Sequence, residues 1–430
     1  MGPELLTIGM FGMLLSAIIL GVSLSFAMGG TAVIFGFLLF GSSGMFSIVS
    51  TMFGGMWSIL LSSIPFFVFI GVALAKSRIA EDLYHSFYLW SGRTPGGLLL
   101  GTSGFAATLS AMTGSCAAST ITTGMVGIPA MKQRGYDQTF VLGTIGASGT
   151  LGILIPPSIT LILIGMQTGQ SVGKLFLGGL VAGLLLLASF LFYVLVRSYL
   201  NKDLAPPTEE LAPFSERIAS LKSVFLPLMV ILSVLVSIFT GIATPTEAAA
   251  VGAAAVTLSV ALRGELNWTY IKEVSYGSAT VTGMVLWIVF GASAFTAIYG
   301  SGGGTAFLQT SLRSMDVEPW MMILFMQAVT LLGMFLDPVG IILLVLPVFF
   351  PIVVTLGVDP IWFCILFQLN LCIGYISPPF GYNLFYLKTL SPEIQITQIY
   401  GAVLPFLGLM LSTGFILFLF PEVITFFTEG

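Results

Sequence analysis

Apolar stretches long enough to cross a membrane alternate with short polar connections along the whole chain. A membrane-spanning helix needs about 20 predominantly apolar residues. The chain shows no long alternation of apolar and polar residues, which would indicate the strands of a barrel. We therefore predict an all-α polytopic membrane protein. The predicted crossings are residues 5–24, 27–46, 57–75, 137–167, 173–198, 223–241, 245–262, 276–300, 360–388 and 400–421.

Two further apolar stretches do not fit single crossings. Residues 95–131 contain two short apolar segments around Thr113-Gly114-Ser115, and residues 319–354 contain two around Asp337-Pro338. Non-helical backbone at membrane depth is tolerated only where protein or a water-filled cavity surrounds it. We therefore predict two re-entrant hairpins, each of which enters and leaves on one side of the membrane.

A repeated pattern of prolines relates these hairpins and the helices that follow them. The pairs, 222 residues apart and in register without a gap, are Pro129 and Pro351, Pro156 and Pro378, and Pro157 and Pro379. Proline lacks an amide hydrogen and interrupts a helix, so 137–167 and 360–388 are predicted to be broken helices, unwound at 149–158 and 371–380. Simple kinks in two continuous helices are the alternative. Five predicted crossings separate the starts of the two units, which makes the second an inverted repeat of the first.

The charge distribution agrees with this layout, because lysine and arginine accumulate on the cytoplasmic side of membrane proteins. If the first hairpin opens to the cytoplasm, twelve of the 14 lysines and arginines fall on that side, and only Lys174 and Arg313 fall outside. Both termini are then predicted to be external. The predicted divisions are N-terminal scaffold helices at 1–56, a first repeat at 57–200, a cytoplasmic linker with scaffold helices at 201–275, a second repeat at 276–422 and an external tail at 423–430.

Composition narrows the class further. Hydrophobic residues make up 57% of the 430 positions and charged residues 7%, with a mean hydropathy of +1.06. A soluble fold could not bury this much apolar surface, so membrane lipid is the expected surrounding. The net charge of −4 gives no reason to expect a nucleic-acid partner. The three cysteines lie in apolar or glycine-rich runs whose spacing indicates neither a disulfide framework nor a metal site.

The first break and its hairpin are rich in hydroxyl groups. Hydroxyls and freed backbone carbonyls are hard ligands suited to an alkali cation, although small hydroxylated residues also pack ordinary membrane helices together. The candidate sodium ligands are Ser110, Thr113, Ser115, Gly149 and Gly152, and the candidate substrate-binding residues are Ser148, Thr150 and Ser158.

The second break differs because an acid, Asp337, lies deep in the hydrophobic run of its hairpin. An ionisable group there indicates function, with a cap on the helix that begins at Pro338 as the alternative. The candidate sodium ligands are Gly333, Asp337, Asn370, Gly374 and Ser377, and the candidate substrate-binding residues are Phe380, Tyr382 and Asn383. One or two intramembrane acids are too few for a proton relay, so sodium is the predicted coupling ion.

An intramembrane enzyme is the alternative from another class, because residues 101–104 and 146–149 both read Gly-x-Ser-Gly. The only histidine, His85, lies in the predicted cytoplasmic connection after the third crossing, whereas serine hydrolysis requires a base within hydrogen-bond reach. No ATP-binding motif is present, and a channel would more naturally show a pore filter. We therefore predict a secondary transporter that is not an enzyme.

Residues 128–137 (IPAMKQRGYD) and 149–159 (GTLGILIPPSI) resemble the large membrane subunit of tripartite ATP-independent periplasmic (TRAP) transporters. In the second half, Leu336-Asp337-Pro338, Ser377-Pro378-Pro379 and Asn383-Leu384-Phe385 are similar to the second repeat of the same family. Three positions depart from the family pattern. Cys116 replaces a serine at the first hairpin tip, and Phe380 and Tyr382 replace smaller or aliphatic residues after the second proline pair.

The resemblance implies a sodium-coupled, elevator-type importer of the ion transporter superfamily in the bacterial inner membrane. It implies a small four-helix membrane subunit as partner, and a periplasmic binding protein that delivers a small organic acid or related polar solute. It also implies one sodium site at Ser115 with the 149–158 break, and another at Asp337 and Asn370 with the 374–378 break. A stand-alone sodium/anion symporter of the same superfamily is the closest alternative.

Overall fold

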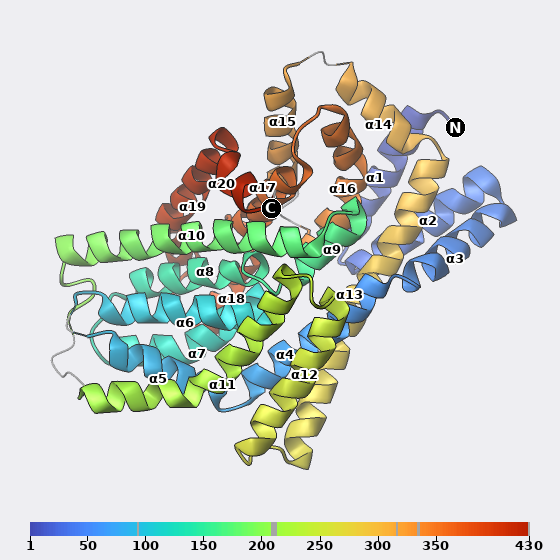
Figure 1. The fold of residues 1–430 in the computed structure, drawn as a ribbon. Coiled ribbons are helices and arrows are strands. Elements are labelled where there is room, and N and C mark those ends of the chain that lie inside the picture. The colour runs from blue at the N-terminus through green and yellow to red at the C-terminus, as the bar shows by residue number, and fades with distance from the viewer. Residues whose placement is uncertain (93, 208–212, 315–316, 333–335, 429–430) are drawn as a thin grey trace.

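The computed structural model describes residues 1–430 apart from 93, 208–212, 315–316, 333–335 and 429–430. All regular elements of the described residues are helices, which confirms the predicted fold class (Figure 1). Seven helical stretches in this part of the chain are long and apolar enough to cross a membrane. They are Ile59–Lys76, Gln138–Thr168, Val172–Leu200, Pro245–Leu262, Trp268–Ser301, Pro338–Thr355 and Ile396–Leu419.

One group of helices, called the scaffold below, is built on the long helix α13 (Trp268–Ser301) and on α4 (Ser63–Lys76). Its other members are α1 (Pro3–Ile19), α2 (Leu24–Phe40), α3 (Ser42–Met56), α11 (Phe214–Phe239) and α12 (Pro245–Leu262). Helix α13 packs against α2, α3 and α4, while α12 lies between α4 and α11. The scaffold occupies the right and lower parts of Figure 1.

Both predicted hairpins are present as pairs of packed helices. The first consists of α6 (Gly97–Thr113) and α7 (Cys116–Lys132), and the second of α15 (Pro319–Leu332) and α16 (Pro338–Thr355). Gly114 joins α6 to α7 with a φ of +60°, a left-handed conformation that favours glycine. Asp337 caps α16, because its Oδ1 accepts the Val339 N–H at 2.9 Å.

Both broken helices are present as well. The first comprises α8 (Gln138–Leu154) and α9 (Ile159–Thr168), and the second α17 (Pro360–Ile376) and α18 (Tyr382–Leu390). The predicted bounds of the unwound segments, 149–158 and 371–380, were wrong, because each helix continues to the second residue before its proline pair and only 155–158 and 377–381 are non-helical. The repeated sequence pattern has a local cause at each start. Asp137 caps α8 by accepting the Phe140 N–H at 2.8 Å, and Asp359, its equivalent, caps α17 by accepting the Trp362 N–H at 2.6 Å. The Pro156-Pro157 and Pro378-Pro379 bonds are both cis.

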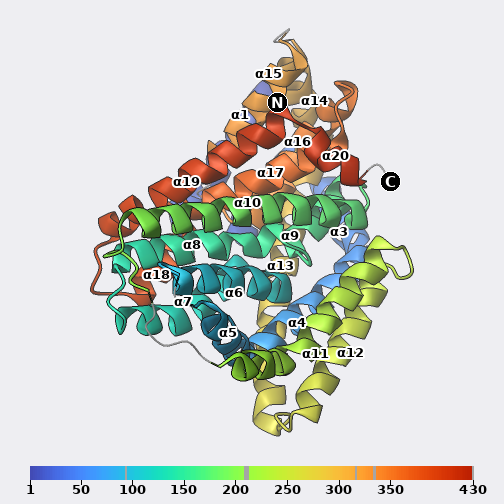
Figure 2. The same cartoon turned by 60° about the vertical axis from the view of Figure 1, so that its left-hand side comes forward.

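The two broken helices form the centre of the molecule. Nearly all of α8 and α17 is buried, and the two helices pack against each other. Around them lie α10 (Val172–Leu200) and α19 (Ile396–Leu419), with α8 between α10 and α6 in Figure 2. The hydrophobic core therefore coincides with the segments that carry the breaks.

Four helices were not predicted from the apolar pattern. They are α3, α5 (Ile79–Trp90), α14 (Gly304–Arg313) and α20 (Glu422–Thr428). The predicted crossing 27–46 instead ends at Phe40, and α3 folds back along α2 so closely that a Cβ on Gly44 would lie 2.2 Å from the Gly36 carbonyl oxygen. The C-terminal α20 packs on α10 and α17 through the buried Ile424.

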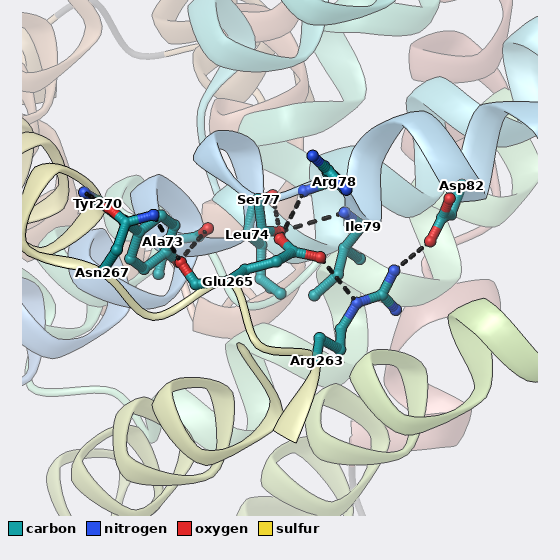
Figure 3. A network of polar contacts seen from close by, with 10 residues as sticks. All are labelled: Ala73, Leu74, Ser77, Arg78, Ile79, Asp82, Arg263, Glu265, Asn267 and Tyr270. Atoms are coloured by element: carbon teal, nitrogen blue, oxygen red, sulfur yellow. Dashed lines mark hydrogen bonds and ion pairs between the residues drawn. The ribbon is translucent and has the colours of Figure 1, made fainter. Parts of the chain in front are cut away.

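A charged network fixes the corner between α4 and α5 to the turn between α12 and α13 (Figure 3). Glu265 accepts the Arg78 N–H at 3.0 Å and pairs with Arg263 at 3.1 Å, and Arg263 also pairs with Asp82 on α5. The Tyr270 hydroxyl donates to the Ala73 carbonyl at 2.7 Å. Because α5 leads into the first hairpin, this network joins the hairpin's connecting helix to the scaffold.

Truncating this network should destabilise the corner. Arg263→Ala removes the partner of two carboxylates, and we expect unfolding to become easier by about 1–2 kcal/mol. A double-mutant cycle with Asp82→Ala, measured as unfolding free energy in detergent, isolates the pair. The matched control is Lys132→Ala, because the Lys132–Glu393 pair has side chains 59% and 53% exposed and should contribute almost nothing. Equal losses in both pairs would contradict the expectation.

Candidate functional site

The tip of the first hairpin docks directly on the first break. A Cβ on Gly152 would lie 2.6 Å from the carbonyl carbon and oxygen of Ser115. A Cβ on Gly114 would lie 2.6 Å from the Pro157 carbonyl oxygen. Such distances are below any real Cβ contact, so only glycine permits this approach of backbone to backbone. The tip and the break therefore form one structural unit.

Three of the predicted ligand side chains surround this contact. The Ser110 hydroxyl lies 2.9 Å from the Ser119 hydroxyl, and Thr113 donates to the Leu109 carbonyl at 3.0 Å. Ser115 caps α7 by accepting the Ala118 N–H at 3.4 Å. Nearby, a Cβ on Gly149 would lie 1.9 Å from the Thr120 Oγ1. The structure thus brings the residues of the first predicted sodium site together.

The predicted substrate residues of the first break are as buried as its predicted ligand Ser110. Ser148, Thr150 and Ser158 are buried. Thr150 donates back to the Ala147 carbonyl at 2.7 Å, and its own carbonyl accepts from the Cys116 thiol at 3.3 Å. The Ser158 hydroxyl donates to the Ile153 carbonyl. Thr150 therefore joins the first broken helix to the hairpin through Cys116, and Ser158 bonds within the break.

A cavity of about 600 Å³ separates the first hairpin from the scaffold. Its wall includes Thr113, Ser115 and Thr122 on the hairpin, and Lys76, Arg78 and Glu81 near the α4–α5 corner. Lys76 pairs with Glu273 at 3.4 Å. The cavity joins predicted ligand hydroxyls to charged residues that the sequence places on the cytoplasmic side.

The sequence did not reveal that α4 forms part of the wall of this cavity. A Cβ on Gly71 would lie 2.8 Å from the Thr113 Cα, so α4 packs tightly against the hairpin near its tip. Gly71 lies in an ordinary apolar run. A single glycine does not indicate a particular contact, because small residues are common wherever membrane helices pack.

The second break has a different set of polar contacts. The Asn370 amide donates to the carbonyl and to the side-chain oxygen of Gln327 on α15. Ser377 donates to the Ile373 carbonyl at 2.7 Å, within its own helix end. Asn383 is buried and donates to the Gly146 carbonyl of α8 at 3.0 Å. The remaining predicted ligand, Gly333, lies outside the described residues.

A small cavity of about 10 Å³ lies between the second hairpin and the second break. A space of this size holds one water molecule or a small ion. The rings of Tyr375 and Tyr382 have their centroids 5.9 Å apart in its wall. Phe380 is 50% exposed. The cavity is lined by Thr330, Leu336, Pro338, Ile341, Asn370, Leu371, Gly374, Tyr375 and Tyr382.

The donor chemistry of both breaks suits an alkali cation. Within the described residues, no group of three or more histidine, cysteine, aspartate or glutamate side chains could hold a metal ion, and all three cysteines are free and buried. The polar groups at the two breaks are hydroxyls, amide oxygens, helix-end carbonyls and the Asp337 carboxylate, and these are hard oxygen ligands.

Comparison with known proteins connects this geometry to transport. Residues 11–423 match the family described as tripartite ATP-independent periplasmic transporter, DctM component. The C4-dicarboxylate TRAP transporter large permease protein DctM of Rhodobacter capsulatus is 31% identical over 418 residues, which covers 94% of each chain. The ectoine TRAP transporter large permease protein TeaC of Halomonas elongata is 27% identical over 423 residues, which covers 98% of each chain.

A solved structure supports the fold alone. The YdaH transporter of Alcanivorax borkumensis, whose crystal structure is described as revealing an unusual topology, superposes with a TM-score of 0.64 over 89% of each chain. Its sequence is only 15% identical to this chain.

Proposed function

The chain belongs to the DctM family of tripartite ATP-independent periplasmic transporters, and we propose that it imports a small organic acid or related polar solute in symport with sodium. The family consists of membrane permeases, which fits the helical fold described above. The observation that carries the sodium proposal is the docking of the first hairpin tip on the first break through Gly152 and Gly114. It places hydroxyls and freed carbonyls side by side.

Each break has a distinct role in the proposal. Residues around Ser115 and Gly152 hold one cation, and Asp337, Asn370 and Gly374 hold another. A bound sodium ion neutralises the converging oxygens and supplies positive charge for an anionic solute. The N-terminus of α7, beside the large cavity, adds partial positive charge for a carboxylate.

The two helical groups suggest how the solute moves. Hairpins and broken helices pack into one body, and the large cavity lies between this body and the scaffold. We propose that the body slides along the scaffold in an elevator motion, and that the cavity releases solute to the cytoplasm between Thr113 and Arg78. A small four-helix membrane subunit and a periplasmic binding protein complete the transporter at the inner membrane.

Uptake into proteoliposomes tests this proposal. Purified chain with its small subunit should accumulate binding-protein-delivered solute when an inward sodium gradient is imposed, and should continue when a protonophore collapses the proton gradient. Transport that follows protons alone would overturn sodium coupling. Equal transport without any binding protein would favour the stand-alone symporter.

A further inference from the structure

Gln368 lies in the middle of α17, in the second repeat, but its side chain reaches the break of the first repeat. It is completely buried. Its Nε2 donates to the Ile153 carbonyl at 2.6 Å and to the Thr160 Oγ1 at 2.7 Å. Ile153 and Thr160 stand on the two sides of the first break, so one amide from the other repeat bridges the gap.

The Ile153 carbonyl oxygen has more hydrogen-bond donors around it than it can accept from. Besides Gln368, the Ser158 hydroxyl and the Thr160 hydroxyl, the latter at 3.3 Å, also point at the Ile153 oxygen. A carbonyl oxygen has only two lone pairs. The Ser158 and Thr160 hydroxyls are 3.0 Å apart, so all three side chains converge on one point.

The oxygen of the same amide, in contrast, lacks a hydrogen-bond partner in the part of the chain that the structure describes. The Gln368 Oε1 is buried and has no hydrogen-bond partner among the described residues. A buried acceptor without a donor is costly and calls for an explanation. The observed orientation of the amide therefore adds a third donor to the Ile153 carbonyl and leaves the Gln368 oxygen without a donor from the described residues.

We propose that Gln368 is a ligand of an alkali cation in the first break, an inference that rests on the proposed sodium coupling. With the amide turned over, Oε1 takes the place of Nε2 beside the Ile153 carbonyl. Two oxygens at that distance repel unless one cation binds both of them. Oε1, the Ile153 carbonyl and the Ser158 and Thr160 hydroxyls then form an all-oxygen set suited to sodium.

This ligand couples the two repeats. Gln368 belongs to the helix that ends at Ile376, immediately before the second break. Binding at the first break therefore acts on the second broken helix through one side chain. The first repeat has Gly146 at the equivalent position, and its carbonyl accepts from Asn383. The amide ligand is thus present in one repeat only, and the first site depends on both.

Sodium titrations of Gln368 variants test the assignment. Gln368→Leu removes the oxygen and keeps the bulk, so the sodium concentration for half-maximal uptake and for half-maximal thermal stabilisation should both rise by about tenfold or more. Gln368→Glu keeps an oxygen and adds charge, so both midpoints should fall. Gln138→Leu serves as the matched control, because Gln138 lies at the start of the first broken helix, far from its break, and donates to the Tyr136 carbonyl at 3.0 Å.

The outcomes separate this inference from the proposed function. Wild-type uptake that ignores sodium would overturn the coupling itself. If wild-type uptake depends on sodium but the sodium midpoints are unchanged in both Gln368 variants, only the ligand role is overturned. Midpoints that shift equally and in the same direction in both variants would also overturn it. If Gln368→Leu does not fold, Thr160→Val should raise the midpoints in the same direction, and unchanged midpoints there would overturn the assignment.

Discussion

Gly152→Ala is expected to abolish uptake while the protein still folds. A Cβ at this position would meet the Ser115 carbonyl at 2.6 Å and the Cys116 amide nitrogen at 2.8 Å. Both are backbone atoms, so no side chain can rotate away. The hairpin tip must instead move off the break, and a displacement of about 1 Å at a site that depends on geometry costs on the order of 100-fold in rate.

The fold should tolerate this change because alanine is the better helix former by about 1 kcal/mol. Gly408→Ala is the matched control, since a Cβ there meets nothing within 4 Å. Sodium-driven uptake and thermal stability are measured for both variants. Wild-type uptake by Gly152→Ala would show that close docking of tip on break is not needed for transport.

Much of this arrangement could be predicted because its signals are local. Asp137 and Asp359 begin the broken helices as caps, and the proline pairs end α8 and α17. Each feature acts within a few residues along the chain. The repeat made these features easier to recognise, because the same aspartate and proline positions recur 222 residues later.

The missed features depend on contacts between distant segments. Gln368 sits in an apolar run and looks like a single polar residue in a buried helix, and only the packing of α17 on α8 brings it to Ile153. In the same way, α3 is hidden because residues 42–56 continue an apolar, glycine-rich stretch. The structure places the turn between α2 and α3 at Gly41, whose φ is +58°, but this glycine is one of many in the stretch.

Asp337→Asn is expected to weaken the binding of the coupling sodium ion without destabilising the protein. The observed role of Asp337 is to cap α16, and asparagine caps a helix about as well as aspartate does. The substitution therefore removes the charge and keeps the cap. If the carboxylate holds a cation beside Asn370 and Gly374, the sodium concentration for half-maximal uptake should rise by about 10- to 100-fold.

A second substitution separates the two roles of this side chain. Asp337→Ala loses both charge and cap, so it should show the same defect in sodium dependence plus a loss of about 1 kcal/mol in stability. Asp359→Asn is the matched control, because Asp359 caps α17 in the same way at the end of the helix far from its break. Normal sodium dependence in Asp337→Asn, with a stability loss confined to Asp337→Ala, would make Asp337 a cap and nothing more. Because the first break has no acid of its own, that result would leave the transporter to bind cations with neutral oxygens alone.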